Sequence, residues 1–173
     1  MAFRSTLQCF ECFRASKLMP YKPSFLFRLV SDIDEYERFV PFCQKSKITS
    51  RDLTTGLPNK ADLTIGFGSF CETFDSRVVC DPVERTVLAD ASHHRLFQYL
   101  KTNWKIAEAS KGRVRVDLEV EFEFASKLHS VVSKMAGSTV ATEIIQGFVD
   151  QAKRKYQMEL SKESTKDDSS NVP

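Results

Sequence analysis

The chain has 173 residues, 42% of them hydrophobic and 28% charged, a balance typical of one folded domain with a single core. Its formal net charge of +2 at pH 7 is too small to indicate a protein that binds nucleic acid through overall charge. The longest stretch without a charged residue is Leu63 to Cys71, whereas a membrane-spanning helix needs about 20 apolar residues. Phe supplies 14 aromatic side chains, against 4 Tyr and 1 Trp, so most of the aromatic surface lacks a polar group.

The cysteines do not form the pattern of a disulfide scaffold, because they are odd in number and scattered: Cys9, Cys12, Cys43, Cys71 and Cys80. We expect them to be reduced. Cys9 and Cys12 form a CxxC pair, but zinc needs further ligands, and the chain offers neither a second CxxC nor a spaced pair of histidines. The sequence therefore predicts no metal site.

The two ends differ in composition from the middle of the chain. Residues 1–9 contain Arg4 and Ser5 but no acidic residue, and they have the character of a short targeting remnant. Residues 158–173 are polar and unpatterned, which predicts a disordered tail. The folded domain is expected to occupy residues 10–157.

The first expected elements are one strand and two short helices. Residues Phe10–Leu18 read as a strand. Pro23 suits the first position of a helix, and the apolar residues that follow it, from Phe25 to Val30, have the spacing of a short amphipathic helix. A second helical turn is expected from Asp34 to Phe39, before Pro41.

Six further strands follow, and short turns between them predict an antiparallel sheet. In Val114–Phe124, apolar and charged residues alternate without an error, which indicates a strand with one face in water. In Leu96–Ile106, alternation places Leu96, Leu100, Trp104 and Ile106 on the inner face. The other four expected strands are Cys43–Arg51, Ala61–Phe67, Phe70–Cys80 and Arg85–Asp90.

One long helix is expected at the end of the domain, from Ser126 to Tyr156. Its apolar residues recur at i, i+4 spacing, and at 1.5 Å per residue it would reach roughly 46 Å, so it must cross the whole sheet. Gly137 near its middle predicts a bend. The expected fold is α+β, a curved antiparallel sheet of about seven strands wrapped around this helix, and such a sheet leaves an apolar gap wherever facing side chains do not fill it.

Four segments together carry a resemblance to a known family: YKPSFLFRLVSDIDEYERFVPFC (21–43), ADLTIGF (61–67), LFQYLKTNW (96–104) and FEFASKL (122–128). They resemble the mitochondrial coenzyme Q-binding proteins of the START-like, or polyketide cyclase, superfamily. The resemblance covers about residues 10–157, and it implies the helix-grip fold.

The resemblance also implies a function, which is non-enzymatic binding of coenzyme Q (ubiquinone). Proteins of this family act as a lipid chaperone or carrier that supports respiratory electron transport and ubiquinone biosynthesis. The implied location is the mitochondrial inner membrane, peripherally on the matrix side. The implied partners are ubiquinone and the membrane surface, with coenzyme Q biosynthetic proteins or respiratory complexes as further candidates; no nucleic acid and no other cofactor is implied.

The expected ligand site is an apolar wall, because a polyprenyl quinone is a long hydrocarbon tail with a small, weakly polar head. Trp104 is the strongest candidate, since its indole N–H needs a partner that a quinone oxygen can supply. For any one aliphatic residue, ordinary core packing explains the pattern as well. The candidates are Leu63, Ile65, Phe67, Leu100, Trp104, Val132, Met135, Val140, Ile144 and Phe148.

A short apolar stretch after the second helical turn is expected to form a gate that touches the membrane. It consists of Phe39, Val40, Pro41 and Phe42, and the basic Lys45 follows it. Near an anionic membrane each basic residue contributes about 1 kcal/mol of attraction. A hydrophobic plug that closes the end of the sheet explains the same residues equally well.

Two other functions remain open at this level. Cyclases and hydrolases share the superfamily, and an enzyme would need an acid–base pair in the cavity, for which the adjacent His93 and His94 are the obvious candidates. Bacterial relatives bind the ribosome, although the nearly balanced charge argues against contact with RNA. No catalytic residue is predicted.

Overall fold

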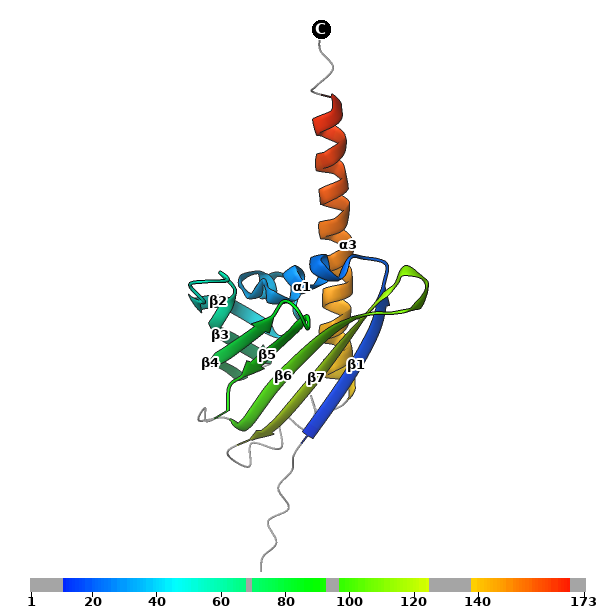
Figure 1. Ribbon diagram of the computed structural model, residues 1–173. Helices are drawn as coiled ribbons and strands as arrows, with labels where there is room; N and C mark the ends of the chain where they lie inside the picture. Colours follow the sequence, from blue (N-terminus) through cyan, green and yellow to red (C-terminus); the bar gives the residue numbers. More distant parts are fainter. Residues whose placement is uncertain (1–10, 68–69, 93–96, 125–137, 169–173) are drawn as a thin grey trace, which may run out of the picture.

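A single antiparallel sheet forms the body of the protein, and it curves around one long helix (Figure 1). The computed structural model describes residues 11–67, 70–92, 97–124 and 138–168. The strands are β1 (Glu11–Met19), β2 (Cys43–Arg51), β3 (Pro58–Phe67), β4 (Phe70–Asp81), β5 (Thr86–Asp90), β6 (Phe97–Glu108) and β7 (Val114–Phe124). The helices are α1 (Pro23–Ser31), the 3-10 helices η1 (Ile33–Arg38) and η2 (Ser110–Gly112), and α3 (Ser138–Asp168).

The strand order is β1-β7-β6-β5-β4-β3-β2, so each strand from β2 to β6 is paired with the next along the chain, and β7 is also paired with β1. All the pairs are antiparallel. Short turns make this topology accessible, and Gly56 and Gly112 occupy turns at φ of +70° and +68°, where a side chain would be strained. The predicted α+β helix-grip fold with seven strands is confirmed.

Alternation along β7 separates a dry face from a wet one, as the sequence predicts. Val114, Val116 and Leu118 are at most 4% exposed on the concave face. Acids between them face water, where Asp117 accepts a hydrogen bond from Ser16 of β1 at 2.6 Å. The row of acids on β7 is therefore a solvated surface that also pairs with β1.

A β-bulge in β6 changes which side chains face inward. The register of β6 against β7 shifts between Phe97 and Tyr99, so that Phe97 and Leu100 both lie on the concave side. Simple alternation gives Phe97 the opposite face from Leu100, yet its side chain is only 4% exposed. Leu96, expected on the inner face, lies outside the described residues.

Helix α3 presents an apolar stripe to the sheet, and its later turns extend beyond the body (Figure 1). Ala141, Ile145, Phe148 and Ala152 are at most 1% exposed, whereas Val140 and Ile144 of the predicted i, i+4 row are only partly buried, so the stripe combines i, i+3 and i, i+4 spacing. The first part of the expected helix, including the expected bend, lies outside the described residues.

The expectation of a disordered tail from residue 158 is wrong up to Asp168, because α3 continues to that residue. Residues 157–163 are mostly strong helix formers, and neither Gly nor Pro occurs between residue 158 and Pro173. A helix already nucleated by packing adds further turns at little cost, so a polar segment of this composition stays helical in water.

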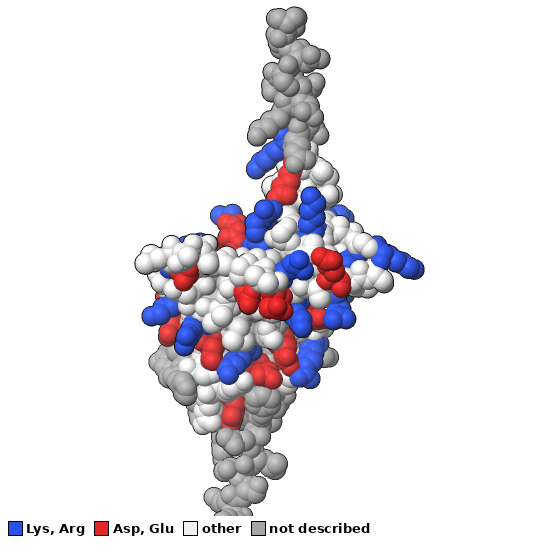
Figure 2. Space-filling view, viewed as in Figure 1, with Lys and Arg blue, Asp and Glu red and all other residues white. Residues whose placement is uncertain are grey.

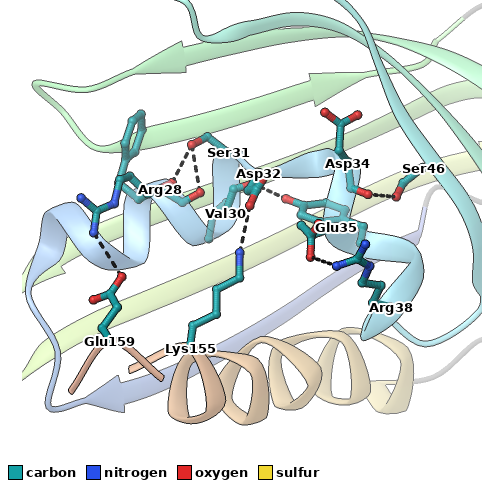
Figure 3. A network of polar contacts seen from close by, with 12 residues as sticks. Arg28, Val30, Ser31, Asp32, Asp34, Glu35, Arg38, Ser46, Lys155 and Glu159 are labelled. Carbon is teal, nitrogen blue, oxygen red and sulfur yellow. Dashed lines mark hydrogen bonds and ion pairs between the residues drawn. The ribbon is translucent and has the colours of Figure 1, made fainter. Parts of the chain in front are cut away.

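Helices α1 and α3 are joined by charged side chains at one end of the sheet (Figure 3). Lys155 of α3 donates to Asp32 at 2.9 Å, and Arg28 of α1 lies 3.8 Å from Glu159. Next to these pairs, the ring of Tyr156 packs on Tyr21 with centroids 5.0 Å apart. These contacts hold α3 across the concave face.

Candidate functional site

An apolar cavity of about 240 Å³ lies between the concave face of the sheet and α3. Its lining comes from β1, η1, the η1–β2 loop, strands β2 to β7, and α3. The residues around it are Phe13, Ile33, Tyr36, Val40, Pro41, Phe42, Cys43, Leu63, Ile65, Gly66, Phe74, Ser76, Val78, Val87, Ala89, Ala91, Phe97, Leu100, Thr102, Trp104, Val120, Phe122, Val140, Ile144 and Phe148.

The cavity exists because small side chains occupy the middle of the concave face. The strand register aligns Val78, Ala89 and Thr102 in one row across β4, β5 and β6. Ser76 and Ala91 flank this row, and both line the same space. Large side chains at these positions would reach α3 and fill the gap, whereas the small ones leave it open.

A cluster of aromatic rings in tilted and edge-to-face contact lies at one end of the cavity. Trp104 and Phe148 pack with ring centroids 4.4 Å apart, and Phe148 makes edge contacts with Tyr36 at 5.1 Å and Phe39 at 4.9 Å. Tyr36 is anchored in turn, because its hydroxyl donates to the Val30 carbonyl. Burial raises the pKa of Tyr36 far above its ordinary value, so the phenol stays neutral.

The structure brings most of the predicted wall residues to this one cavity. Seven of them line it: Leu63, Ile65, Leu100, Trp104, Val140, Ile144 and Phe148. Val132 and Met135 lie outside the described residues, and so does the side chain of Phe67, the last residue of β3. Their proposed roles stay predictions.

Sequence reasoning missed several residues that line the cavity. Ser76 and Thr102 share the parity of Phe74 and Trp104 on their strands, so alternation alone could have found them. The hydrophobic pattern does not mark them, because a hydroxyl side chain is polar. Phe97 could not be found in this way, since the bulge in β6 reverses its face.

The predicted gate forms a lip beside the cavity. Val40, Pro41 and Phe42 line the cavity, while Phe39 packs on Phe148 and Lys45 is exposed. Whether the lip touches a membrane or acts as a plug stays a prediction.

Two backbone contacts fix the lip. Phe42 has a φ of 66°, a left-handed conformation that is uncommon for a side chain of this size, and its carbonyl accepts a hydrogen bond from Gly66 of β3 at 2.9 Å. A Cβ atom at Gly147 of α3 would lie 2.6 Å from the Phe39 carbonyl oxygen, so the absence of a side chain there permits close contact.

Ionisable groups are sparse around the cavity. Among the described residues that line it, Tyr36 and Cys43 carry the only titratable side chains. Burial raises the pKa of Cys43 to about 11, which keeps its thiol protonated at neutral pH. His93 and His94, the candidates for an enzyme, lie outside the described residues.

One group of metal-ligating atoms lies elsewhere, at the edge formed by β1 and β7. Ligand atoms of Cys12, Glu119 and Glu121 lie within 4.8 Å of one another. Arg14 already forms an ion pair with Glu119, and Tyr99 donates to Glu121 at 2.9 Å. Burial and the Glu119 hydrogen bond raise the pKa of Cys12, so this group is better suited to internal pairing than to holding a cation.

The surface carries mixed charge. On the face shown in Figure 2, Lys and Arg side chains are interspersed with Asp and Glu. No helix among the described residues is long and apolar enough to cross a membrane.

Comparison with known proteins finds a family and close relatives. Residues 19–149 match the family described as polyketide cyclase / dehydrase and lipid transport. The chain is 71% identical to the mitochondrial coenzyme Q-binding protein coq10 of Schizosaccharomyces pombe, over 94% of this chain and 99% of that one. It is 32% identical to the ribosome association toxin RatA of Rickettsia prowazekii, over 82% of this chain and 95% of that one.

A solved structure shares the fold. The Zhui aromatase/cyclase of Streptomyces sp. R1128 superposes with a TM-score of 0.67 at 14% identity, covering 85% of this chain and 96% of that one. At this identity the likeness concerns the fold alone.

Proposed function

The chain belongs to the mitochondrial coenzyme Q-binding proteins of the polyketide cyclase and lipid transport family, and we propose that it binds coenzyme Q, without catalysing a reaction, in the cavity between the sheet and α3. The observation that carries the proposal is the composition of the cavity wall. Its described lining has no carboxylate, imidazole, amine or guanidinium group. Such a wall suits a ligand that is mostly hydrocarbon and carries no charge.

The size of the cavity bears on how the ligand is held. At about 240 Å³ it is smaller than typical sites for drug-sized ligands, which span about 300–1,000 Å³. A quinone ring with the first part of its tail matches this space, and a long isoprenoid tail exceeds it. We therefore propose that the ring is enclosed and that most of the tail leaves past the lip formed by Val40, Pro41 and Phe42.

This arrangement supports a role as a carrier or chaperone at a membrane. A tail that leaves beside an apolar lip can stay in lipid while the ring is held by protein. The exposed Lys45 next to the lip adds attraction to an anionic surface. We propose peripheral binding on the matrix side of the mitochondrial inner membrane, in support of respiratory electron transport and coenzyme Q biosynthesis. Partners there would be biosynthetic proteins or respiratory complexes.

The test is mass spectrometry of an organic extract of the purified protein, with a matched pair of variants. Leu63→Ser places a hydroxyl in the wall of the cavity, whereas Leu18→Ser makes the same change on β1 at a side chain that is 54% exposed. We expect about one ubiquinone per chain in the parent and in Leu18→Ser, and at least a tenfold loss in Leu63→Ser. Circular dichroism verifies that both variants are folded.

An empty parent that also fails to take up added ubiquinone would contradict the proposal. The RatA relative makes ribosome association the competing function, and salt-sensitive co-sedimentation with ribosomal subunits that is indifferent to Leu63→Ser would favour it. A dependence of cellular activity on His93 or His94 would instead favour an enzyme.

A further inference from the structure

The cavity contains two hydroxyl groups that the fold does not use. Ser76 of β4 is only 4% exposed, and Thr102 of β6 is partly buried; both side chains line the cavity. Neither hydroxyl forms a hydrogen bond with another described residue, and neither oxygen is fully buried, so both are open to the cavity. Two hydroxyls elsewhere on the sheet are paired in comparison: Ser46 donates to the Asp34 carbonyl, and Thr64 bonds Thr73.

An unpaired hydroxyl in an apolar space is costly to keep. Moving such a group out of water without a partner costs about 1–3 kcal/mol, and buried polar groups are for this reason almost always hydrogen-bonded. Ala, the residue at the neighbouring positions 89 and 91, fits the same face without that cost. The two hydroxyls therefore point to a ligand with acceptor atoms inside the cavity.

The strand register fixes how the two hydroxyls are related. Thr102 pairs with Ala89 of β5, which pairs with Val78 of β4, and Ser76 is two residues from Val78 on the same strand face. On a flat sheet this places the two Cα atoms about 12 Å apart, because they are separated by two strand spacings across the sheet and by two residues along it. The concave curvature of the sheet brings their side chains closer together.

A quinone ring matches this spacing. Its two carbonyl oxygens lie at opposite ends of a six-membered ring, and a hydrogen bond of about 2.8 Å at each end bridges a gap of this order. The floor between the hydroxyls is made of Ala89 and Ala91, on which a flat ring can lie. Trp104 adds its indole at the aromatic end of the same cavity.

On these grounds we propose that the Ser76 and Thr102 hydroxyls donate hydrogen bonds to the two carbonyl oxygens of the quinone ring, and that they select a quinone over a plain isoprenoid hydrocarbon. This inference rests on the proposed function, because it assigns the head-group contacts within the same cavity. The aliphatic wall then binds the start of the tail, and the two hydroxyls orient the ring.

The variants Ser76→Ala and Thr102→Val test this directly, since each removes a hydroxyl and adds no bulk. Thr73→Val on the outer face of β4, where Thr73 bonds Thr64, is the matched control. The probes are ubiquinone with a short isoprenoid tail and squalene, an isoprenoid hydrocarbon without a ring. We expect each cavity variant to bind ubiquinone about three- to tenfold more weakly, and to bind squalene no worse than the parent. Thr73→Val is expected to change neither affinity.

Infrared spectra of bound ubiquinone, labelled with ¹³C at one carbonyl or the other, give a second readout that does not depend on affinity. Both carbonyl bands are expected at lowered frequency in the parent, and one band is expected to return to the free frequency in each variant. Bound ubiquinone with two free carbonyl bands, or unchanged affinity in both variants, would overturn the inference and leave the proposed function standing. A parent that binds squalene and ubiquinone equally would overturn it as well. A parent that binds neither probe would overturn both proposals.

Discussion

The two ends of the concave face are built from the same sheet yet differ in how they are filled. At the packed end, side chains from α1, β1, β6 and β7 pack without lining the cavity; Met19, Leu26, Ile106, Val116 and Leu118 are all at most 2% exposed there. At the hollow end, Ser76, Ala89 and Thr102 face α3 across an open space.

The difference shows that a few small side chains, and not a different architecture, leave this space open. The row Trp104–Leu118 and the row Thr102–Val120 are neighbours on β6 and β7. In the first row, the Trp104 indole packs directly on Phe148 of α3. In the second row, Thr102 and Val120 face the cavity. Stability and binding are therefore expected to respond to changes at opposite ends of the sheet.

The largest expected effect is on the free energy of unfolding, when Ile is replaced by Ala at the packed end and, for comparison, at the hollow end. Ile106→Ala at the packed end should lower the free energy of unfolding by about 2–5 kcal/mol, because it opens a new void in close packing. Ile65→Ala at the hollow end should cost less than about 1.5 kcal/mol, since that side chain already borders empty space. Urea denaturation of the ligand-free proteins measures both. Equal losses would show that the two ends are packed alike.

A filled cavity should separate binding from stability. Ala89→Leu projects extra methyl groups into the hollow end, and we expect at least a tenfold loss of ubiquinone affinity with a free energy of unfolding within about 1 kcal/mol of the parent. Ala107→Leu is the control for added bulk, because Ala107 lies on β6 and on the face of the sheet that points away from the cavity. If Ala89→Leu binds as tightly as the parent, the ligand lies elsewhere.

The smallest effect is expected at the ion pair that ties α3 to α1. Lys155 and Asp32 are 29% and 40% exposed, so Lys155→Met should cost about 0.5 kcal/mol at low salt and less at high salt. Lys153→Met, an exposed neighbour on α3, is the control. Thermal unfolding at two salt concentrations measures the difference. Ubiquinone affinity should not change, because the pair lies outside the cavity lining.

Much of the fold could be predicted because its signals are local. Perfect alternation marks β7 from Val114 to Phe124, and Pro23 marks the start of α1. The bulge in β6 could not be predicted, since it depends on pairing with β7. The end of α3 could not be predicted, because a polar segment of this kind can be coil or helix. Which of the two forms depends on the helix that precedes it.

For the candidate site, the sequence indicates which side chains face inward but not whether a cavity remains between them. Periodicity indicates that Leu63, Leu100 and Ile144 face inward, and all three line the cavity. Whether facing side chains meet depends on sheet curvature and on the distance to α3, which no local pattern encodes. The sequence signal for the cavity is the run of small residues on β4 and β5. With Ser76, Ala89 and Ala91 at the centre of the concave face, the sheet does not fill the space up to α3.

The contacts of the lip determine how a ligand can be exchanged. The Phe39 carbonyl rests against Gly147 of α3, and the Phe42 carbonyl is held by Gly66 of β3. Only Val40 and Pro41 lie between these two anchors, and proline fixes one of the remaining dihedral angles. We therefore expect the backbone of the lip to move little relative to the sheet. We expect the rate of ligand exchange to depend on how often α3 moves away from the concave face of the sheet.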